Sequence, residues 1–234
     1  MKMLTLKDFY VNLSPSIKST IFITIVLIII LFIINRKLKK YDYNDTPKGL
    51  ILILEWLIGG INDMCKTIVG KNYRRIAPYI TTLAIFLFVA NISGLFGLTP
   101  PTASVSCTVT LGIMSFTIIQ FAGIRSQGIL EYLKGYIDPN PIFLPINIIG
   151  EIATPISLGL RLFGNILSGS VIMMLIYQVV GWASVVVAPL FHCYFDIFSG
   201  YIQTLVFCTL TTMFIAGKLP DEEVDYYDNN EEII

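Results

Sequence analysis

The chain has 234 residues, of which 55% are hydrophobic and only 14% are charged. Soluble domains carry about 25% charged residues, so this composition excludes an ordinary soluble exterior and predicts one that faces lipid. The 16 basic and 16 acidic residues balance, which gives no case for nucleic-acid binding. The four cysteines form no CxxC pair and only one histidine is present, so we expect no zinc site, no disulfide framework and no cofactor.

The first predicted element is a membrane span over residues 20–35, within an N-terminal segment 1–40. With its apolar flanks it reaches the roughly 20 residues that cross a bilayer as a helix. We expect it to be retained rather than cleaved as a signal peptide, because Asp8, Asn12 and Pro15 interrupt the preceding stretch and no small-residue cleavage site follows. Four cations end the span and mark the cytoplasmic side: Arg36, Lys37, Lys39 and Lys40.

Residues 47–70 form a second apolar segment of a different kind. Glu55, Asp63 and Lys66 interrupt it, and cations flank both of its ends. This pattern predicts an amphipathic helix that lies on the cytoplasmic face of the membrane. A full crossing is the alternative.

Two clear spans follow within residues 77–125, at 77–98 and 105–124. The loop between them, residues 99–102, is uncharged and contains two prolines, which stop a helix. Asn91, in the first of these spans, is expected to satisfy a packed helix by a hydrogen bond, with the lining of a cavity as the alternative.

Residues 141–217 contain two apolar segments that are longer than a bilayer requires. The first, 141–180, would be roughly 60 Å long as a helix, whereas the hydrocarbon core is about 30 Å thick. It must therefore tilt steeply, break or re-enter, with Pro145 and Pro155 as the predicted kink positions. Gly181 separates it from the second segment, 183–217.

Together these elements predict an all-α membrane protein with one membrane domain. It has about five transmembrane helices, an interfacial helix and a C-terminal hairpin of two long, steeply tilted helices. With the N-terminus outside, the inside segments hold twelve of the sixteen cations, which agrees with the positive-inside rule. The acidic tail, residues 218–234, is then cytoplasmic.

Arg161 is the most informative residue, because it lies about midway along an apolar segment. A guanidinium cannot be neutralised, and placing it at the bilayer centre costs at least about 2.5–3.5 kcal/mol. No carboxylate lies three or four residues away to pair with it, so a structural salt bridge would need another helix or subunit. Polar neighbours share its helical stripe, namely Thr154, Ser157, Asn165 and Ser168.

A second stripe follows the last segment in steps of three and four residues: His192, Asp196, Ser199, Gln203 and Phe207. Asp196 is costly in lipid and should face a partner or water, where its carboxyl group can gain and lose a proton. The alternatives are a structural ion pair for Asp196, a hydrogen bond to a neighbouring helix for Gln203 and simple packing for His192. Glu151 lies beside Asn147 and either lines a water-filled path or sits near the interface.

Two motifs carry a family resemblance. Residues 155–165 read Pro-Ile-Ser-Leu-Gly-Leu-Arg-Leu-Phe-Gly-Asn, and residues 194–203 read Tyr-Phe-Asp-Ile-Phe-Ser-Gly-Tyr-Ile-Gln. In this order and at this separation they closely resemble subunit a of F-type ATP synthases, over roughly residues 75–217. The first 70 residues match only in layout.

The resemblance implies the stator half of an ion path, set against a rotating ring of c subunits, with subunit b of the peripheral stalk as a further partner. Arg161 resembles the family's essential arginine, which faces the ring carboxylate and separates two aqueous half-channels. Asp196 occupies a relay position, Gln203 matches a glutamine near the arginine, and Asn165 matches the asparagine one turn after it. A bacterial plasma membrane is expected, with an organellar origin left open.

The sequence also departs from the family pattern. Ser170 stands where some members carry glutamate or histidine, and Asn147 stands where several have glutamate, with Glu151 one turn later. The lining of the half-channels is therefore left open, as is the choice between proton and sodium. Two other functions are alternatives. A secondary ion transporter with a midplane site predicts inverted repeats, and none is found in the sequence. A purely structural membrane subunit would not need Arg161 and Asp196 on apolar helices.

Overall fold

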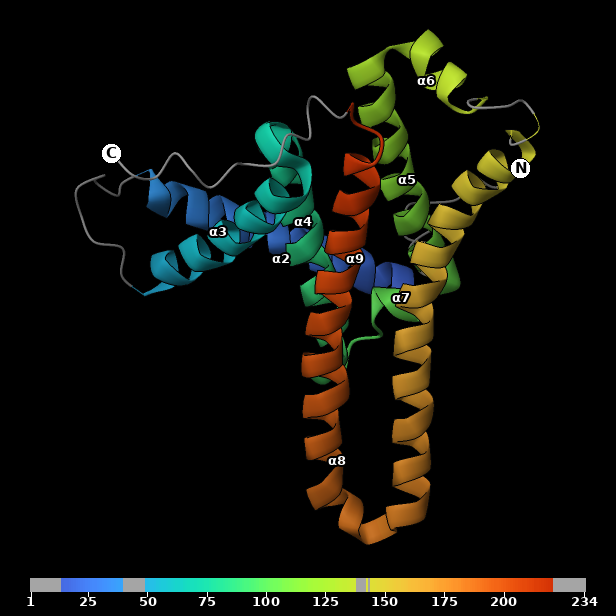
Figure 1. Cartoon of the computed structure of the whole chain (residues 1–234). Coiled ribbons are helices and arrows are strands. Elements are labelled where there is room, and N and C mark those ends of the chain that lie inside the picture. The colour runs from blue at the N-terminus through green and yellow to red at the C-terminus, as the bar shows by residue number, and fades with distance from the viewer. Residues whose placement is uncertain (1–13, 40–48, 138–141, 143, 221–234) are drawn as a thin grey trace, which may run out of the picture. The chain divides into compact units, whose positions relative to one another are not determined.

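A computed structural model describes residues 14–39, 49–137, 142 and 144–220 (Figure 1). Every regular element in these ranges is a helix, which confirms the predicted all-α class. The longer helices are α2 (Pro15–Leu38), α3 (Leu50–Val69), α4 (Tyr73–Ile92), α5 (Val105–Gln127), α6 (Ile129–Gly135), α7 (Leu144–Val180), α8 (Ser184–His192) and α9 (Ser199–Ala216). Short 3₁₀ turns η1 (Gly70–Asn72), η2 (Ser93–Phe96), η3 (Pro101–Ala103) and η5 (Gly181–Ala183) connect them, and η6 (Cys193–Phe198) is a π-helix.

Four continuous helical stretches in the described ranges are long and apolar enough to cross a membrane: Pro15–Leu38, Ile51–Phe96, Val105–Gln127 and Leu144–Ala216. The last contains both limbs of the C-terminal hairpin, so the four stretches accommodate the five predicted crossings. Whether α3 lies on the membrane or crosses it stays a prediction. The acidic tail from residue 221 onward lies outside the described residues.

The chain divides into two compact units. Unit 1 comprises residues 1–41, 85–111 and 158–204, and unit 2 comprises residues 42–84, 112–157 and 205–234. Helices α4, α5, α7 and α9 each contribute residues to both units.

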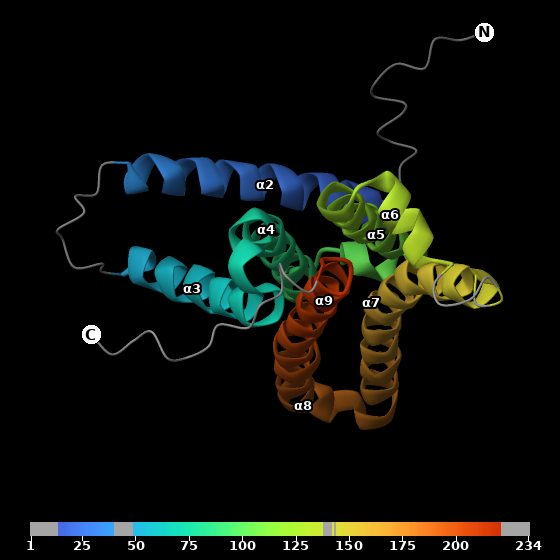
Figure 2. The same ribbon diagram turned by 45° about the horizontal axis from the view of Figure 1, so that its top comes forward.

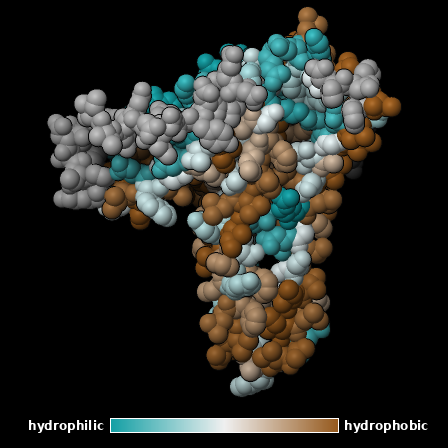
Figure 3. Space-filling model, viewed as in Figure 1, coloured by the Kyte–Doolittle hydropathy of each residue, from teal (hydrophilic) through white to brown (hydrophobic). Residues whose placement is uncertain are grey.

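Unit 1 contains α2 and most of the C-terminal hairpin. The hairpin's limbs, the later part of α7 and the run from α8 into α9, lie antiparallel and are joined by η5 (Figures 1 and 2). Hydrophobic side chains cover the end of the hairpin near this turn on the face that Figure 3 shows. Their outward orientation is the expected one for helices that face lipid.

A close contact in unit 1 explains one of the glycines on α7. A Cβ on Gly159 would lie 3.0 Å from both the Thr108 carbonyl oxygen and the Val109 Cα, which are backbone atoms of α5. Small residues allow such close backbone approach in membrane proteins. Gly150 and Gly164 differ, because a Cβ at either position would meet nothing within 4 Å.

Unit 2 has a core of apolar side chains from α3, α4 and α9. Cys65, Val69, Ile80 and Phe207 are fully buried there. Only the C-terminal half of α3 joins this core, since Trp56 in its N-terminal half is 76% exposed.

The structure refines the predicted boundaries. Helix α7 is one continuous helix of 37 residues, so the break considered for residues 141–180 is not observed. Pro145 is the second residue of α7, where a missing backbone N–H costs nothing because that group has no partner within the helix. Pro155 lies inside α7 without interrupting it. The short helix α6 and the π-helix η6 were not predicted.

Candidate functional site

Arg161 lies on the exposed side of α7. Its neighbours Leu158 and Leu162 are buried, with exposed fractions of 1% and 0%, and they fix that face of the helix against unit 1. Arg161 is exposed, as are Ser157 and Ser168 on the same stripe. In the part of the chain that the structure describes, no ion pair to Arg161 is found. Arg161 is therefore an exposed cation, and none of the carboxylates among the described residues pairs with it.

A pocket of about 260 Å³ lies within unit 1 and is called the Asp196 pocket. It is lined by Gly94, Leu98, Pro100, Asn165, Ile166, Gly169, Ser170, Met173, His192, Phe195 and Asp196. Four residues singled out from the sequence thus meet in one cavity, namely Asn165, Ser170, His192 and Asp196. The opposite wall comes from the segment that contains η2.

Hydrogen bonds order the polar side of the Asp196 pocket. The His192 Nδ1 lies 2.7 Å from Asp196 Oδ2, and the His192 Nε2 lies 3.0 Å from the Tyr177 hydroxyl. Ser199 donates to the Asn165 Oδ1 over 2.9 Å and ties the two limbs of the hairpin together. Tyr177 has no predicted role in the sequence analysis.

The π-helix η6 carries Asp196. A π-turn has i→i+5 hydrogen bonds and inserts an extra residue into a helix, and such turns occur frequently at functional sites. Phe195 packs against Gly169 on α7, where a Cβ would lie 3.6 Å from the Phe195 ring. The π-turn thus directs the Phe195 ring at α7 and leaves Asp196, with an exposed side-chain fraction of 21%, lining the pocket.

Gln203 does not line the Asp196 pocket. Its side chain is 7% exposed, and its Nε2 has no hydrogen-bond partner within the described residues. Close to Gln203 on the same helix, Gly200 and Thr204 accept hydrogen bonds from the Asn91 amide of α4, at 3.3 and 3.4 Å, and the Asn91 Oδ1 accepts from Thr102. Asn91 therefore satisfies packed helices, as the sequence predicted.

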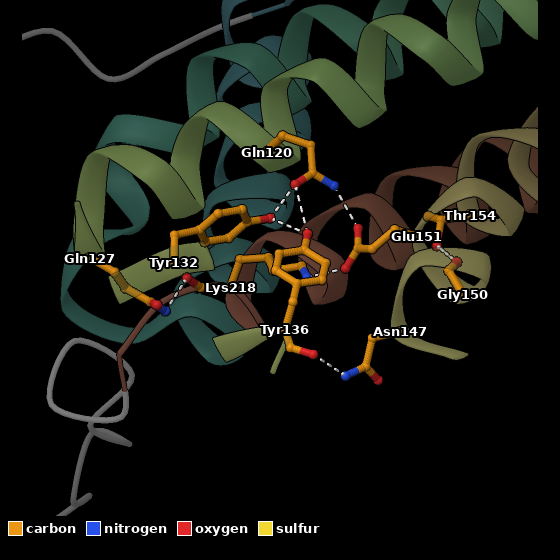
Figure 4. Close-up of polar contacts among 9 residues, drawn as sticks. All are labelled: Gln120, Gln127, Tyr132, Tyr136, Asn147, Gly150, Glu151, Thr154 and Lys218. Carbon is orange, nitrogen blue, oxygen red and sulfur yellow. Dashed lines mark hydrogen bonds and ion pairs between the residues drawn. The ribbon is translucent and has the colours of Figure 1, made fainter. Parts of the chain in front are cut away.

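A second cavity of about 690 Å³ lies within unit 2 and is called the Glu151 pocket. Its polar lining includes Asn147, Glu151 and Thr154 from α7, Gln127 and Tyr136, and Lys218 beyond the end of α9. Glu151 and Asn147, predicted from the sequence, both face this pocket. Figure 4 shows their side chains with the hydrogen bonds that surround them.

Both carboxylate oxygens of Glu151 have partners. Lys218 forms an ion pair with Oε1, and the Gln120 amide donates to Oε2 over 2.5 Å (Figure 4). The Gln120 carbonyl oxygen in turn accepts hydrogen bonds from the hydroxyls of Tyr132 and Tyr136. The Lys218 ammonium also lies 5.0 Å from the centre of the Tyr136 ring, within the range of a cation–π contact.

Tyr132 is the buried member of this cluster, with 7% of its surface exposed. Burial, followed by its hydrogen bond with Tyr136 and the nearby charge of Glu151, raises the pKa of the Tyr132 phenol. Tyr132 therefore stays protonated and remains a hydrogen-bond donor. Gly123 makes room for its ring, since a Cβ there would lie 2.6 Å from the Tyr132 Cε2.

Sequence reasoning missed Gln120, Tyr132, Tyr136, Lys218 and Tyr177. Lys218 had one usable signal, since it is the first charged residue after a long apolar segment. No sequence signal singled out the glutamine and the three tyrosines, because both residue types are common near the ends of membrane helices. Arg161 and Gln203, which were predicted, line neither pocket.

Comparison with known proteins identifies the family. The family described as ATP synthase A chain matches residues 18–216. The chain is 32% identical over 221 residues to a protein of Propionigenium modestum named ATP synthase subunit a, sodium ion specific, covering 88% of this chain and 74% of that protein. It is also 32% identical to ATP synthase subunit a of Legionella pneumophila strain Philadelphia 1, covering 91% and 89% of the two chains, and of Nitrosospira multiformis, covering 88% and 81%.

The matched residues include Arg161, the pocket-lining residues up to the end of α9, and all of the described candidate membrane spans except the first three residues of the first span. The chain is a multi-pass integral membrane protein, and it belongs to the ATP synthase A chain family of the F0 sector.

Proposed function

We propose that this chain is the stator subunit that conducts ions past the c-ring of an F-type ATP synthase. The observation that carries the proposal is Arg161, an exposed cation on an apolar helix with buried leucines behind it. A permanent cation in lipid is costly, and a ring carboxylate that moves past it would offset that cost. Because the guanidinium cannot lose its proton, it can displace an ion from each arriving carboxylate and block direct leakage.

The two pockets are the proposed half-channels. Each lies within one unit, is lined by polar side chains and holds a carboxyl group, Asp196 in one and Glu151 in the other. Asn165, Ser170 and His192 complete the polar lining of the first, and Asn147 that of the second. Gln203, whose buried amide nitrogen lacks a partner among the described residues, is proposed to act near Arg161 when the ring is bound.

The free energy released by each transported ion determines how many ions the complex must use for each ATP. One unit charge that crosses 100 mV releases about 2.3 kcal/mol, so synthesis of one ATP requires several ions. This chain would supply the ion path and the torque-generating contact, while nucleotide chemistry belongs to other subunits. The proposed partners are the c-ring and subunit b of the peripheral stalk.

The proposed location is a bacterial plasma membrane with the C-terminus in the cytoplasm. The charges of the described residues support this orientation, since the end of α2 carries Arg36 and Lys37, and the end of α9 is followed by Lys218. Cations gather on the cytoplasmic side of membrane proteins.

Replacing Arg161 by alanine tests the proposal in the complete ATP synthase, assembled in inverted membrane vesicles. ATP-driven ion uptake should fall to the background level, while the amount of assembled complex stays unchanged. Arg125→Ala is the matched control, because Arg125 is an exposed arginine in the last turn of α5 and lines neither pocket. Uptake that persists in Arg161→Ala would contradict the proposal.

A further inference from the structure

Three side chains in unit 1 form a continuous hydrogen-bonded chain. The Tyr177 hydroxyl lies 3.0 Å from His192 Nε2, and His192 Nδ1 lies 2.7 Å from Asp196 Oδ2. Tyr177 comes from α7, His192 from the end of α8 and Asp196 from the π-helix η6. The contact therefore joins the two limbs of the hairpin across fifteen residues of sequence.

Tyr177 is an exposed residue, whereas the side chains of His192 and Asp196 are partly buried, with exposed fractions of 34% and 21%. His192 and Asp196 line the Asp196 pocket, whereas Tyr177 lies outside it. The hydrogen-bonded chain thus leads from an exposed tyrosine to a carboxyl group inside the proposed half-channel.

The hydrogen-bonding capacity of the three groups fixes where the protons lie. An ionised carboxylate only accepts hydrogen bonds, and a neutral imidazole has one donating and one accepting nitrogen. With Asp196 ionised, Nδ1 must carry the proton, so Nε2 accepts one from the Tyr177 hydroxyl. With Asp196 protonated, every bond reverses: Asp196 donates to Nδ1, and Nε2 donates to the Tyr177 oxygen.

We infer that Tyr177 and His192 form a relay that delivers protons to Asp196, with the Tyr177 hydroxyl as its outer member. The inference rests on the proposed function of the chain. It identifies the proton as the ion that this half-channel carries, because hydroxyl and imidazole groups pass on protons, whereas hard metal cations take oxygen ligands and the pair with His192 already occupies Asp196 Oδ2.

One delivery is balanced in atoms and charge. A hydronium ion gives a proton to the Tyr177 oxygen and becomes water, the Tyr177 hydroxyl proton moves to Nε2, and the Nδ1 proton moves to Oδ2. The products are water, neutral tyrosine, neutral imidazole and the carboxylic acid. After Asp196 passes its proton onward, water-mediated exchange of the imidazole proton from Nε2 back to Nδ1 restores the first arrangement.

The test uses the complete ATP synthase in proteoliposomes and measures ATP synthesis driven by an imposed proton gradient at several external pH values. Tyr177→Phe keeps the ring and removes the hydroxyl, and it should slow synthesis about three- to tenfold, the worth of one hydrogen bond. The loss should grow as the external pH rises, because scarce hydronium ions make the relay limiting. His192→Gln should slow synthesis by about 10²-fold, the lower end of the range for a positioned proton-transfer group.

The matched control is Tyr194→Phe, which removes the hydroxyl of another exposed tyrosine in the same hairpin. The Tyr194 ring packs on Phe195 and Phe198, and the described contacts use the ring alone. Its rate and pH profile should match those of the wild type.

Three outcomes would overturn the relay: equal rates in the Tyr177 and Tyr194 variants, a loss in Tyr177→Phe that is the same at every pH, or synthesis that follows a sodium gradient and survives a protonophore. The titratable groups among the described residues lining the pocket are His192 and Asp196, so a pH-dependent loss reports on this chain of groups. Arg161→Ala in the same assay separates the two proposals, because its retained activity would overturn the proposed function, whereas the three outcomes above leave that function standing.

Discussion

The two pockets each hold one carboxyl group, but the groups that balance them differ in kind. Glu151 faces the Lys218 ammonium and receives a second hydrogen bond from Gln120. Asp196 faces the His192 imidazole, and its pocket is otherwise lined by neutral side chains. An ammonium keeps its charge across the physiological pH range, whereas an imidazole is the side chain whose charge ordinarily changes within it.

Glu151 and Lys218 thus form an ion pair, whereas Asp196 and His192 form a hydrogen-bonded pair between which a proton can move. The Glu151 pair is locked within a hydrogen-bonded cluster that also contains Tyr132 and Tyr136. Because Lys218 and Gln120 hold both of its oxygens, we expect the Glu151 carboxylate to position these neighbours rather than to pass on protons. Asp196 has a partner that can give and take a proton, so we expect it to change charge during each ion transfer.

The largest effect that this comparison predicts is the loss of ion transport when the Asp196 carboxyl group is removed. Replacing Asp196 by asparagine keeps the shape and removes the proton-accepting group. We expect coupled ion transport in vesicles to fall about 10²-fold or more. Glu151→Gln, measured in the same way, should retain most of the transport, because the carboxylate in that pocket is expected to position its neighbours rather than to pass on protons.

Asp63→Asn is the control for removing a carboxylate, since Asp63 is exposed on α3 and lines neither pocket. If Glu151→Gln abolished transport while Asp196→Asn preserved it, the roles of the two pockets would be reversed.

The next largest predicted effect is on stability and concerns the ion pair between Glu151 and Lys218. Lys218→Met leaves the Glu151 carboxylate without its cation and should lower the free energy of unfolding by about 1–3 kcal/mol. This is less than the 3–5 kcal/mol for a fully buried pair, because the two side chains are 24% and 20% exposed. Denaturant unfolding of the purified chain in detergent micelles measures it.

The double variant Glu151→Gln with Lys218→Met sharpens this test. Removing both charges should recover part of the lost stability, since no uncompensated carboxylate remains. Lys134→Met is the control, because Lys134 is an exposed lysine in the last turn of α6. If Glu151→Gln lowered the free energy of unfolding by the same amount in Lys218→Met as in the wild type, Glu151 and Lys218 would not act as a pair.

The sequence predicted the helices and the hairpin because both depend on local signals. A long apolar run forms a helix in lipid, and Gly181 marks the turn between the limbs. The gathering of His192 and Asp196 was also predictable, since a four-residue step places both on one helix face.

The rest of the site depends on contacts that no local pattern encodes. Gln120 and Lys218 reach Glu151 from 31 and 67 residues away, and nothing in the sequence sets the register between those helices. The π-helix η6 differs from an α-helix by one extra residue in a turn. The packing of Phe195 on Gly169, which accompanies that turn, is visible only in three dimensions.

The smallest predicted effect concerns Tyr132, at the buried end of the fixed cluster. Tyr132→Phe removes the hydrogen bonds to Gln120 and Tyr136 and should lower the free energy of unfolding by about 1 kcal/mol. Because folding raises the pKa of Tyr132, its hydroxyl stabilises the folded state fully below pH of about 10, the ordinary tyrosine value, and progressively less above it.

The gap in unfolding free energy between wild type and Tyr132→Phe should therefore shrink as the pH rises past about 10. Tyr73→Phe is the control, since Tyr73 lies at the start of α4 and lines neither pocket. A gap that widened at alkaline pH would mean that the folded protein favours the phenolate, which the neighbouring Glu151 carboxylate should oppose.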